Sequence, residues 1–317
     1  MALNYREWRD GDDLELIQLW GGPENAQVEQ ARALFRPSSN TPWLRCIVAE
    51  DMTGTGSAGT GTAETSTGVP VAAAYVFEPK LHNQRLWAYI EVAADHRRTG
   101  VGSTLLAMLR HEAGGSPSGA TQLRAKVIPG STGGDFAAAS GFGQIQRSRI
   151  VKMEPGALSL PVFDDAGGPQ LDEAATGSVE LTTAVAAWYN AVHAWDPADM
   201  TLGQAQQYLL ADTTGAGGAV VLRDKPQADG GRIAAFAISY TQTRTDDPAD
   251  VLVGYDPTLA PAEQEAAAAS LLAMLVHQFP VLVEVDDSMT ALVNVIDPLL
   301  AVGSASVSAP ETLVVSD

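Results

Sequence analysis

The stretch EVAADHRRTGVGSTLLAML, residues 91–109, places two arginines and two glycines between a run typical of a strand and a run typical of a helix. The first N–H groups of a helix have no partner within the helix, so they attract an anion. Glycines let a ligand approach the backbone closely, and the arginines add positive charge. The stretch therefore predicts a phosphate-binding turn at the start of a helix.

The whole chain has the composition of a globular protein. It contains 317 residues, of which 45% are hydrophobic and 18% are charged, and this length fits two domains of about 150 residues each. The formal net charge of -19 argues against nucleic acid or an anionic membrane as the main partner, because both require a basic surface. The same charge weakly favours cationic or neutral substrates, and it also fits an acidic surface that serves solubility alone.

Cys46 is the only cysteine, which excludes an intrachain disulfide and a cysteine-based metal site within one chain. Its apolar surroundings, WLRCIVAE, indicate a buried hydrophobic residue rather than a nucleophile. The N-terminal sequence carries charges where a signal peptide needs an apolar core, and no apolar run has the length of a membrane span. We therefore expect a cytoplasmic protein with no membrane partner.

The apolar pattern predicts two units of one architecture. Residues 1–156 form the first unit, a Pro-, Gly- and Asp-rich linker covers 157–177, and residues 178–317 form the second. The expected fold class is α+β in three layers, with a mixed, mostly antiparallel sheet flanked by helices in each unit. The Gly/Ser/Thr-rich tract at 52–68 indicates a loop. The expected strands of the first unit lie within 3–8, 43–51, 69–79, 86–94, 121–128 and 142–153, and its helices within 12–20, 25–35, 101–113 and 133–141.

The spacing Arg97-x-x-Gly100-x-Gly102 resembles the acetyl-CoA motif of the GNAT N-acetyltransferase superfamily. The preceding IEVAADH resembles the strand and turn of that family, and FAAASGF, which ends in Gly141 and Phe142, resembles its closing helix. A Rossmann site would instead need G-x-G-x-x-G in the first strand-to-helix turn.

The resemblance implies acetyl-CoA as co-substrate, with the pyrophosphate on the amides of the turn. It also implies that the pantetheine arm pairs with a strand edge that splays from its neighbour. It assigns the cofactor contacts to Val92, Ala93, Arg97, Arg98, Thr99, Gly100, Val101, Gly102, Ser103 and Thr104.

Direct acetyl transfer needs a base for the ammonium and an acid for the leaving thiolate. The family often supplies the acid from a Tyr four residues before Gly-Phe, and Ala137 stands at that position here. Because side chains alternate along a strand, we expect Glu91 to face away from Val92 unless a bulge or the splay turns it. Each remaining candidate also fits a purely structural role; the candidate bases are Glu91, Glu78 and His82, and the candidate acids are Tyr89 and Tyr75.

The second unit repeats the strand, turn and helix as VLVGYDPTLAPAEQEAAAASLLAML, residues 251–275, but it lacks the motif. Aligned by sequence, Glu263 and Glu265 replace the two glycines, so we expect no CoA there. The tandem arrangement and the segment SGFGQIQRSRIVKM are similar to mycothiol synthase, a two-domain GNAT protein. The chemistry of that family lies in its C-terminal copy, whereas the intact motif here lies in the N-terminal copy.

The leading interpretation is an acetyl-CoA-dependent N-acetyltransferase that acts without a metal on a small-molecule or peptide amine, by direct transfer. A non-catalytic CoA-binding or interaction protein is the alternative, and a scaffold in which neither copy binds CoA is a third. The acceptor amine stays unassigned, and a homodimer stays open.

Overall fold

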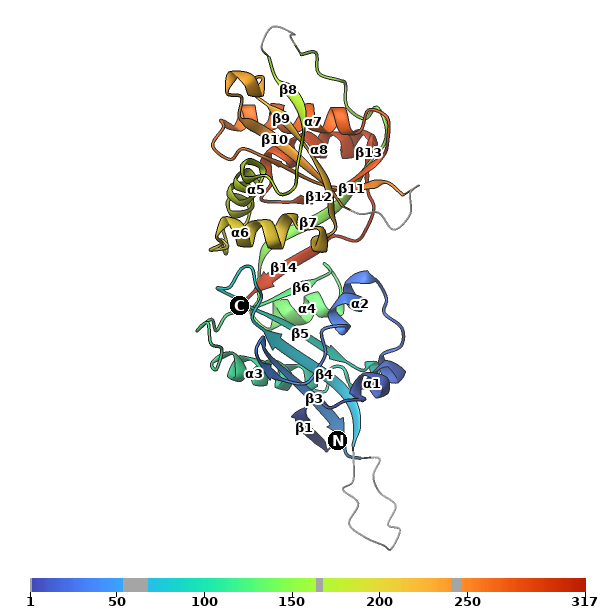
Figure 1. Cartoon of the computed structure of the whole chain (residues 1–317). Helices are drawn as coiled ribbons and strands as arrows, with labels where there is room; N and C mark the ends of the chain where they lie inside the picture. The colour runs from blue at the N-terminus through green and yellow to red at the C-terminus, as the bar shows by residue number, and fades with distance from the viewer. Residues whose placement is uncertain (1, 54–67, 164–167, 241–246) are drawn as a thin grey trace, which may run out of the picture. The chain divides into compact units, whose positions relative to one another are not determined.

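The computed structural model describes residues 2–53, 68–163, 168–240 and 247–317. By their contacts the residues form two compact units, whose elements are labelled in Figure 1. Most of the Gly/Ser/Thr-rich tract, residues 54–67, lies outside the described residues. The first unit comprises Met1–Lys126, Asp135–Gly143 and Val315–Asp317, and the second comprises Val127–Gly134 and Gln144–Val314.

The sheet of the first unit has the strand order β1-β3-β4-β5-β6. Neighbouring strands are antiparallel except for β5 and β6, which are parallel. The strands are β1 (Leu3–Glu7), β3 (Trp43–Asp51), β4 (Val69–Phe77), β5 (Leu86–Val92) and β6 (Leu123–Val127), with the short β2 (Ser39–Asn40) paired to β3. The helices are α1 (Asp12–Trp20), α2 (Ala26–Arg32), α3 (Val101–Ala113) and α4 (Thr132–Ala139).

Helices cover both faces of this sheet. Ala72 and Ala74 of β4 pack in one core with the apolar face of α3, and the alternate residues Ala73 and Tyr75 pack in another with Leu16 of α1. Period-two alternation along β4 therefore produces three layers, as the sequence predicts. The predicted apolar face of α3 is buried at each of its four positions, namely Val101, Leu105, Leu106 and Leu109.

The second unit repeats this plan with the strand order β7-β12-β11-β10-β9-β8. Its parallel pair is β11 with β12, which correspond in chain order to β5 and β6. The strands are β7 (Gly143–Met153), β8 (Gln170–Ala174), β9 (Ala216–Arg223), β10 (Ile233–Tyr240), β11 (Ala249–Tyr255) and β12 (Val281–Asp286), with β13 (Ala305–Val307) paired to β7. The helices are α5 (Val179–Val192), α6 (Leu202–Ala205), α7 (Pro261–Leu275) and α8 (Thr290–Val302).

Three segments fall outside the expected outline of the units. The strand β7 was expected to close the first unit, but it pairs antiparallel with β12 and belongs to the second from Gln144 onward. The expected linker, 157–177, contains β8, which pairs with β9. The final strand β14 (Thr312–Ser316) contributes residues from Val315 onward to the first unit. Among the described helices, none has the length and apolar character needed to cross a membrane.

Candidate functional site

The turn between β5 and α3 depends on two left-handed residues. After β5 the chain forms a short 3-10 turn, Ala94–His96. Arg98 then has φ 64° and Gly100 has φ 92°, and α3 begins at Val101. Left-handed geometry is costly for residues with a Cβ atom, so Gly100 suits its position. A Cβ added at Gly102 would contact the Phe136 ring at 3.5 Å, an ordinary packing distance.

The start of α3 is open toward solvent. Gly100 supplies no side-chain cap, and the described first turn of the helix contains no acidic residue. Ser103 and Thr104 are exposed there. The amides of Val101, Gly102 and Ser103 have no carbonyl four residues earlier within the helix, so they and the helix dipole favour an anion. The Thr104 amide, by contrast, donates to the Gly100 carbonyl at 3.0 Å. This helix end has the chemistry of the predicted phosphate seat.

The two arginines of the turn are exposed, and one of them touches the end of the strand. The Nε atom of Arg97 donates to the carbonyl of Val92 at 3.0 Å. The hydroxyl of Thr99 donates to the carbonyl of His96 at 2.6 Å, which holds the turn closed on itself. The Nε2 atom of His96 lies 3.1 Å from a carboxylate oxygen of Asp51.

The strands β5 and β6 separate before the turn. Their ladder is limited to Leu86 with Leu123 and Trp87 with Arg124, although β5 continues to Val92. On its other side β5 pairs with β4 from Trp87 to Val92. Beyond Trp87, β5 is therefore no longer paired with β6, and its edge on that side is free toward the turn. This separation of the two strands is the splay that the family resemblance implies.

The backbone at the end of β5 distinguishes Val92 from Ala93. The Ala93 amide donates to the Val71 carbonyl at 2.8 Å, and its carbonyl accepts the His96 amide at 2.9 Å. Hydrogen-bonding pairs alternate in an antiparallel ladder, so the N–H and C=O of Val92 point away from β4 to the open side. Ala93 was expected to contact the cofactor, but its backbone groups are already engaged. Of the two residues, Val92 therefore has its backbone groups on the open side, where its carbonyl accepts the Nε atom of Arg97.

Glu91 lies on the face of β5 opposite to Val92, as alternation predicts, and it forms a polar cluster there. Arg32 of α2 holds its carboxylate in a bidentate pair, with Nε–Oε2 at 3.0 Å and Nη2–Oε1 at 2.6 Å. The hydroxyl of Tyr89 donates to the same Oε2 at 2.9 Å. The side chains of Arg32 and Glu91 are only 14% and 12% exposed. The pairing raises the pKa of Arg32, and burial, together with the Glu91 carboxylate, raises that of Tyr89.

Arg32 is the site residue that sequence reasoning missed. It stands 59 positions before Glu91, on a helix that carries no motif, so only the fold brings the two together.

The other candidate acids and bases lie elsewhere. Glu78 follows the end of β4 that pairs with the start of β5, at the far end from Val92, and it accepts bonds from Ser116 and Ser118. Burial tends to raise the pKa of Glu78, but these hydrogen bonds outweigh it and lower the pKa. His82 lies in the loop beyond that same end of β4 and is buried. The structure therefore does not bring Glu78 or His82 to the turn.

Tyr75, Ala137 and Cys46 are core residues. Tyr75 is fully buried among aromatic rings, and burial raises its pKa. Ala137 is buried as well, so the position of the usual acid carries no proton donor. Burial raises the pKa of Cys46 to about 12, which fits the predicted buried hydrophobic residue.

The corresponding helix of the second unit is closed by its own side chains. A carboxylate oxygen of Glu263 accepts the Ala260 amide at 3.0 Å. The side chain of Gln264 donates to the carbonyls of Pro257 and Leu259. The helix starts after Ala260 as α3 starts after Gly100, so the caps align these two positions. The sequence alignment of Glu263 with Gly100 was therefore three residues out of register, and Glu263 opposes an anion because it caps the helix.

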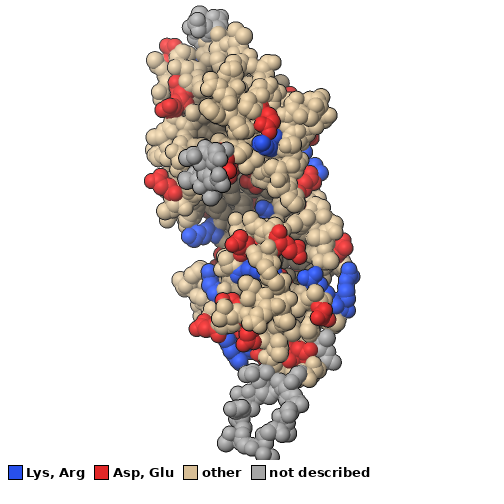
Figure 2. Space-filling view, turned by 90° about the vertical axis from the view of Figure 1, so that its right-hand side faces the viewer, with Lys and Arg blue, Asp and Glu red and all other residues tan. Residues whose placement is uncertain are grey.

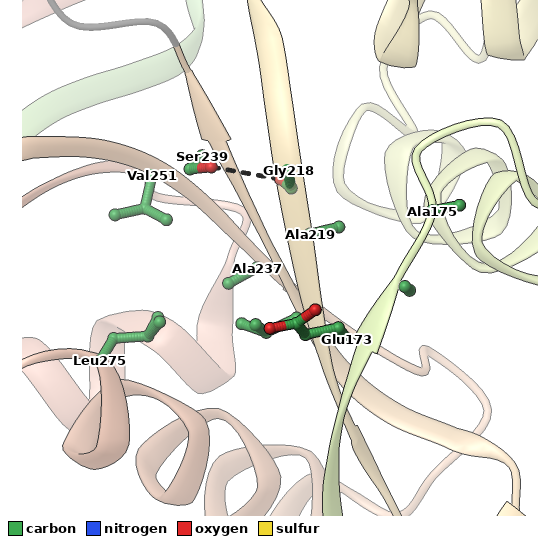
Figure 3. A pocket seen from close by; sticks show the side chains of 10 residues that line it. Glu173, Ala175, Gly218, Ala219, Ala237, Ser239, Val251 and Leu275 are labelled. Atoms are coloured by element: carbon green, nitrogen blue, oxygen red, sulfur yellow. Dashed lines mark hydrogen bonds between the residues drawn. The ribbon is translucent and has the colours of Figure 1, made fainter.

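A separate hollow of about 740 Å³ lies in the second unit (Figure 3). Small residues of β8, β9 and β10 line it, including Ala174, Gly218 and Ala237, and Leu275 of α7 borders it. The hydroxyl of Ser239 is already bonded to the Gly218 carbonyl. This hollow lies away from the start of α7 and contributes nothing to the turn chemistry.

Two further features of the described residues concern metal ions and surface charge. Within 2–53, 68–163, 168–240 and 247–317, no group of three His, Cys, Asp or Glu side chains is placed to hold a metal ion. On the face drawn in Figure 2, basic and acidic side chains are interspersed.

Comparisons with known proteins give the fold. No protein-family model matches the sequence, and no curated protein matches it. A GCN5-related N-acetyltransferase from Sphaerobacter thermophilus is similar in structure, with a TM-score of 0.59 and 13% identity over 99% of this chain and 95% of that chain. A tandem GNAT protein from the clavulanic acid biosynthesis pathway has a TM-score of 0.52 and 14% identity, over 100% and 98%. A probable N-acyltransferase from Enterococcus faecalis V583 has a TM-score of 0.52 and 10% identity, over 99% and 72%. The chain thus has the tandem fold of GNAT N-acetyltransferases.

Proposed function

We propose that the protein is an acetyl-CoA-dependent N-acetyltransferase whose first unit binds the cofactor at the turn between β5 and α3. The observation that carries the proposal is the open start of α3 beside the free edge of β5. The pyrophosphate binds the amides of Arg98 to Ser103, with Arg97, Arg98 and the Thr104 side chain beside it. The pantetheine arm pairs with Val92, and Arg97 must then release the Val92 carbonyl.

The chemistry is direct transfer to a small-molecule or peptide amine. The ammonium group first gives one proton to a base, and the neutral amine attacks the thioester carbonyl. The C–N bond forms, the nitrogen gives its second proton to solvent, the C–S bond breaks, and CoA leaves as the thiolate, which solvent protonates. The N–H of Val92 polarises the thioester oxygen. Glu91 is the nearest candidate base along the strand. Tyr89 is a poor acid for the thiolate, because its proton is directed to Glu91.

Acetyl-CoA titration into wild type and Ser103→Glu tests the cofactor site. Ser103 occupies the third position of α3, which matches Glu263 of α7, so the substitution copies the closed helix start of the second unit. We expect about one site per chain in wild type and at least about a tenfold loss of affinity in the variant. The free energy of unfolding without ligand should rise by about 0.3–1 kcal/mol, because the new carboxylate complements the helix dipole.

Glu263→Ser is the matched control in the second unit. It should lower stability and leave acetyl-CoA affinity unchanged. Wild-type binding that survives Ser103→Glu would place the cofactor elsewhere, and an absence of wild-type binding would remove the proposal.

The second candidate function is a CoA-binding protein without turnover. Two observations favour it: Ala137 stands where the family often has its acid, and Arg32 occupies the Glu91 carboxylate. Release of free thiol from acetyl-CoA in the presence of a panel of primary amines separates the two functions. Binding without thiol release across the panel would support the non-catalytic protein.

A further inference from the structure

The hollow of the second unit lies where helix α7 ends on its sheet (Figure 3). Leu275, which borders the hollow, is the last residue of α7. Gly218 of β9 pairs with Ser239 of β10, and Ser239 pairs with Val251 of β11. Cross-strand partners share one face of a sheet, so these three residues form a row of the floor. The hollow therefore lies between this row and the end of α7.

The first unit has an arginine where the second has Gly218. The strands β5 and β11 each have seven residues, and each begins at the first pair of its parallel ladder, so Ala88 corresponds to Val251. Ala88 pairs with Val76, and Val76 pairs with Arg45 of β3. Followed across the sheet in the same way, Val251 leads to Gly218. Arg45 and Gly218 are therefore equivalent positions of the two repeats.

The Arg45 side chain shows what chemistry this position takes in the first unit. Its guanidinium group lies over the ring of Trp43 at 5.3 Å. Its Nε atom pairs at 3.5 Å with a carboxylate oxygen of Glu112 on α3, the helix that corresponds to α7. An arginine thus fills the space with its apolar stem and places a cation beside a carboxylate. Gly218 supplies neither, and the hollow of about 740 Å³ in the second unit has the size of a small-molecule site.

The sides of the hollow favour a cation. Glu173 of β8 pairs with Val220, and Val220 pairs with Ala237, so the Glu173 side chain lies on the face that forms the floor. The described lining residues include this carboxylate and no basic side chain. The described last turn of α7 also lacks a basic residue, so the negative end of the helix dipole has no cation of its own there. With Ala237 and Val251 buried below, an apolar floor meets an acidic rim.

We infer that this hollow binds a small apolar cation, an ammonium or guanidinium group on a short chain or ring. The apolar part fills the space above Gly218, and the charge pairs with Glu173, so the ligand takes the place that the Arg45 side chain occupies in the first unit. A neutral molecule of the same shape gains the apolar contact alone, and an anion is repelled by Glu173. The inference goes beyond the proposed acetyl transfer, because the site uses no residue of the turn before α3.

An amide NMR titration of the full-length chain tests the charge of the ligand. Phenethylammonium is the cation, and phenethyl alcohol and hydrocinnamate carry the same ring and two-carbon chain with no charge and with a negative charge. Phenethylammonium should bind at one site and shift the amides of β8, β9 and β10. We expect phenethyl alcohol to bind about threefold more weakly, the effect of an exposed ion pair, and hydrocinnamate to bind more weakly still. Equal affinities for the three compounds would overturn the proposal.

Substitutions at the rim and the floor locate the site. Glu173→Gln removes only the charge of an exposed side chain, so phenethylammonium should bind about threefold more weakly. Asp229→Asn is the matched control, since Asp229 is exposed and does not line the hollow. Gly218→Arg restores the side chain of the first unit and should abolish binding, whereas Gly217→Arg, at an exposed glycine outside the lining, should not.

The Glu173→Gln result decides the proposal even if Gly218→Arg does not fold, because an exposed side chain can be replaced without repacking the core. Affinity of Glu173→Gln equal to that of wild type would overturn the site. Neither titration uses acetyl-CoA, so its outcome is separate from the test of the cofactor site.

Discussion

Gly100 and Gly102 have different physical roles in the turn before α3. Gly100 has φ 92° with nothing within 4 Å of an added Cβ, so its requirement is conformational. Gly102 is helical, and its added Cβ would make only ordinary contacts with Phe136 and Val92. Alanine at Gly100 therefore measures the cost of the left-handed backbone conformation, and alanine at Gly102 measures the gain in helix propensity.

We predict that Gly100→Ala lowers the free energy of unfolding by about 1–2 kcal/mol, because alanine is strained in the left-handed region. Gly102→Ala should be neutral or stabilising by up to about 1 kcal/mol, because alanine is the better helix former. Urea unfolding of the two variants beside wild type checks the pair, and each serves as the control for the other. Equal losses in both would contradict the assignment of a conformational requirement to Gly100.

At the scale of elements, Glu78 joins the end of β4 to the segment after α3 and makes that connection sensitive to acid. Its carboxylate accepts the Ser116 hydroxyl at 2.6 Å and the Ser118 amide at 2.7 Å. Its folded pKa lies below the usual 4.5, so its contribution to stability is complete above that value and is lost as pH falls through the folded pKa.

We predict that stability falls more steeply from about pH 5 to about pH 3 in wild type than in Glu78→Gln. Urea unfolding across this range measures the slopes, with exposed Glu15→Gln as control; a Glu78→Gln slope equal to wild type would contradict the assignment.

The sequence predicts an element well where local pattern and packing agree, as for α3. Its apolar positions recur with helical spacing, and these are the positions that the core buries. The sequence did not predict β8, because Asp172 and Glu173 interrupt its apolar alternation and its ladder with β9 supplies the missing information. The same limit hides Arg32: an ion pair across 59 positions leaves no periodic trace, whereas the turn at Gly100 is a local motif.

At the scale of the whole molecule, the two repeats differ in what they do with one helix start. In α3 the first turn is left open, and in α7 Glu263 closes it. The shared plan thus carries the candidate cofactor site in the first unit, and the second unit keeps the architecture with a helix start that its own Glu263 caps. The last strand of each repeat belongs, by its contacts, to the other unit. From Gln144 onward β7 is part of the second unit, and Val315–Asp317 are part of the first.

The first unit therefore depends on residues that the chain reaches only after passing through the second. A carboxylate oxygen of Asp317 accepts the amide of Leu123, a fully buried residue of β6, at 2.8 Å, and the other accepts Arg110 of α3 at 2.9 Å. We predict that Asp317→Ala lowers the stability of the first unit by about 1–3 kcal/mol, because it leaves a buried amide without this acceptor. Amide exchange should rise in α3 and β6 and stay unchanged in β9 and β10, and exposed Asp10→Ala should alter neither unit. If β9 and β10 lose protection to the same extent, the two units unfold as one cooperative body, and acetyl-CoA should then protect both.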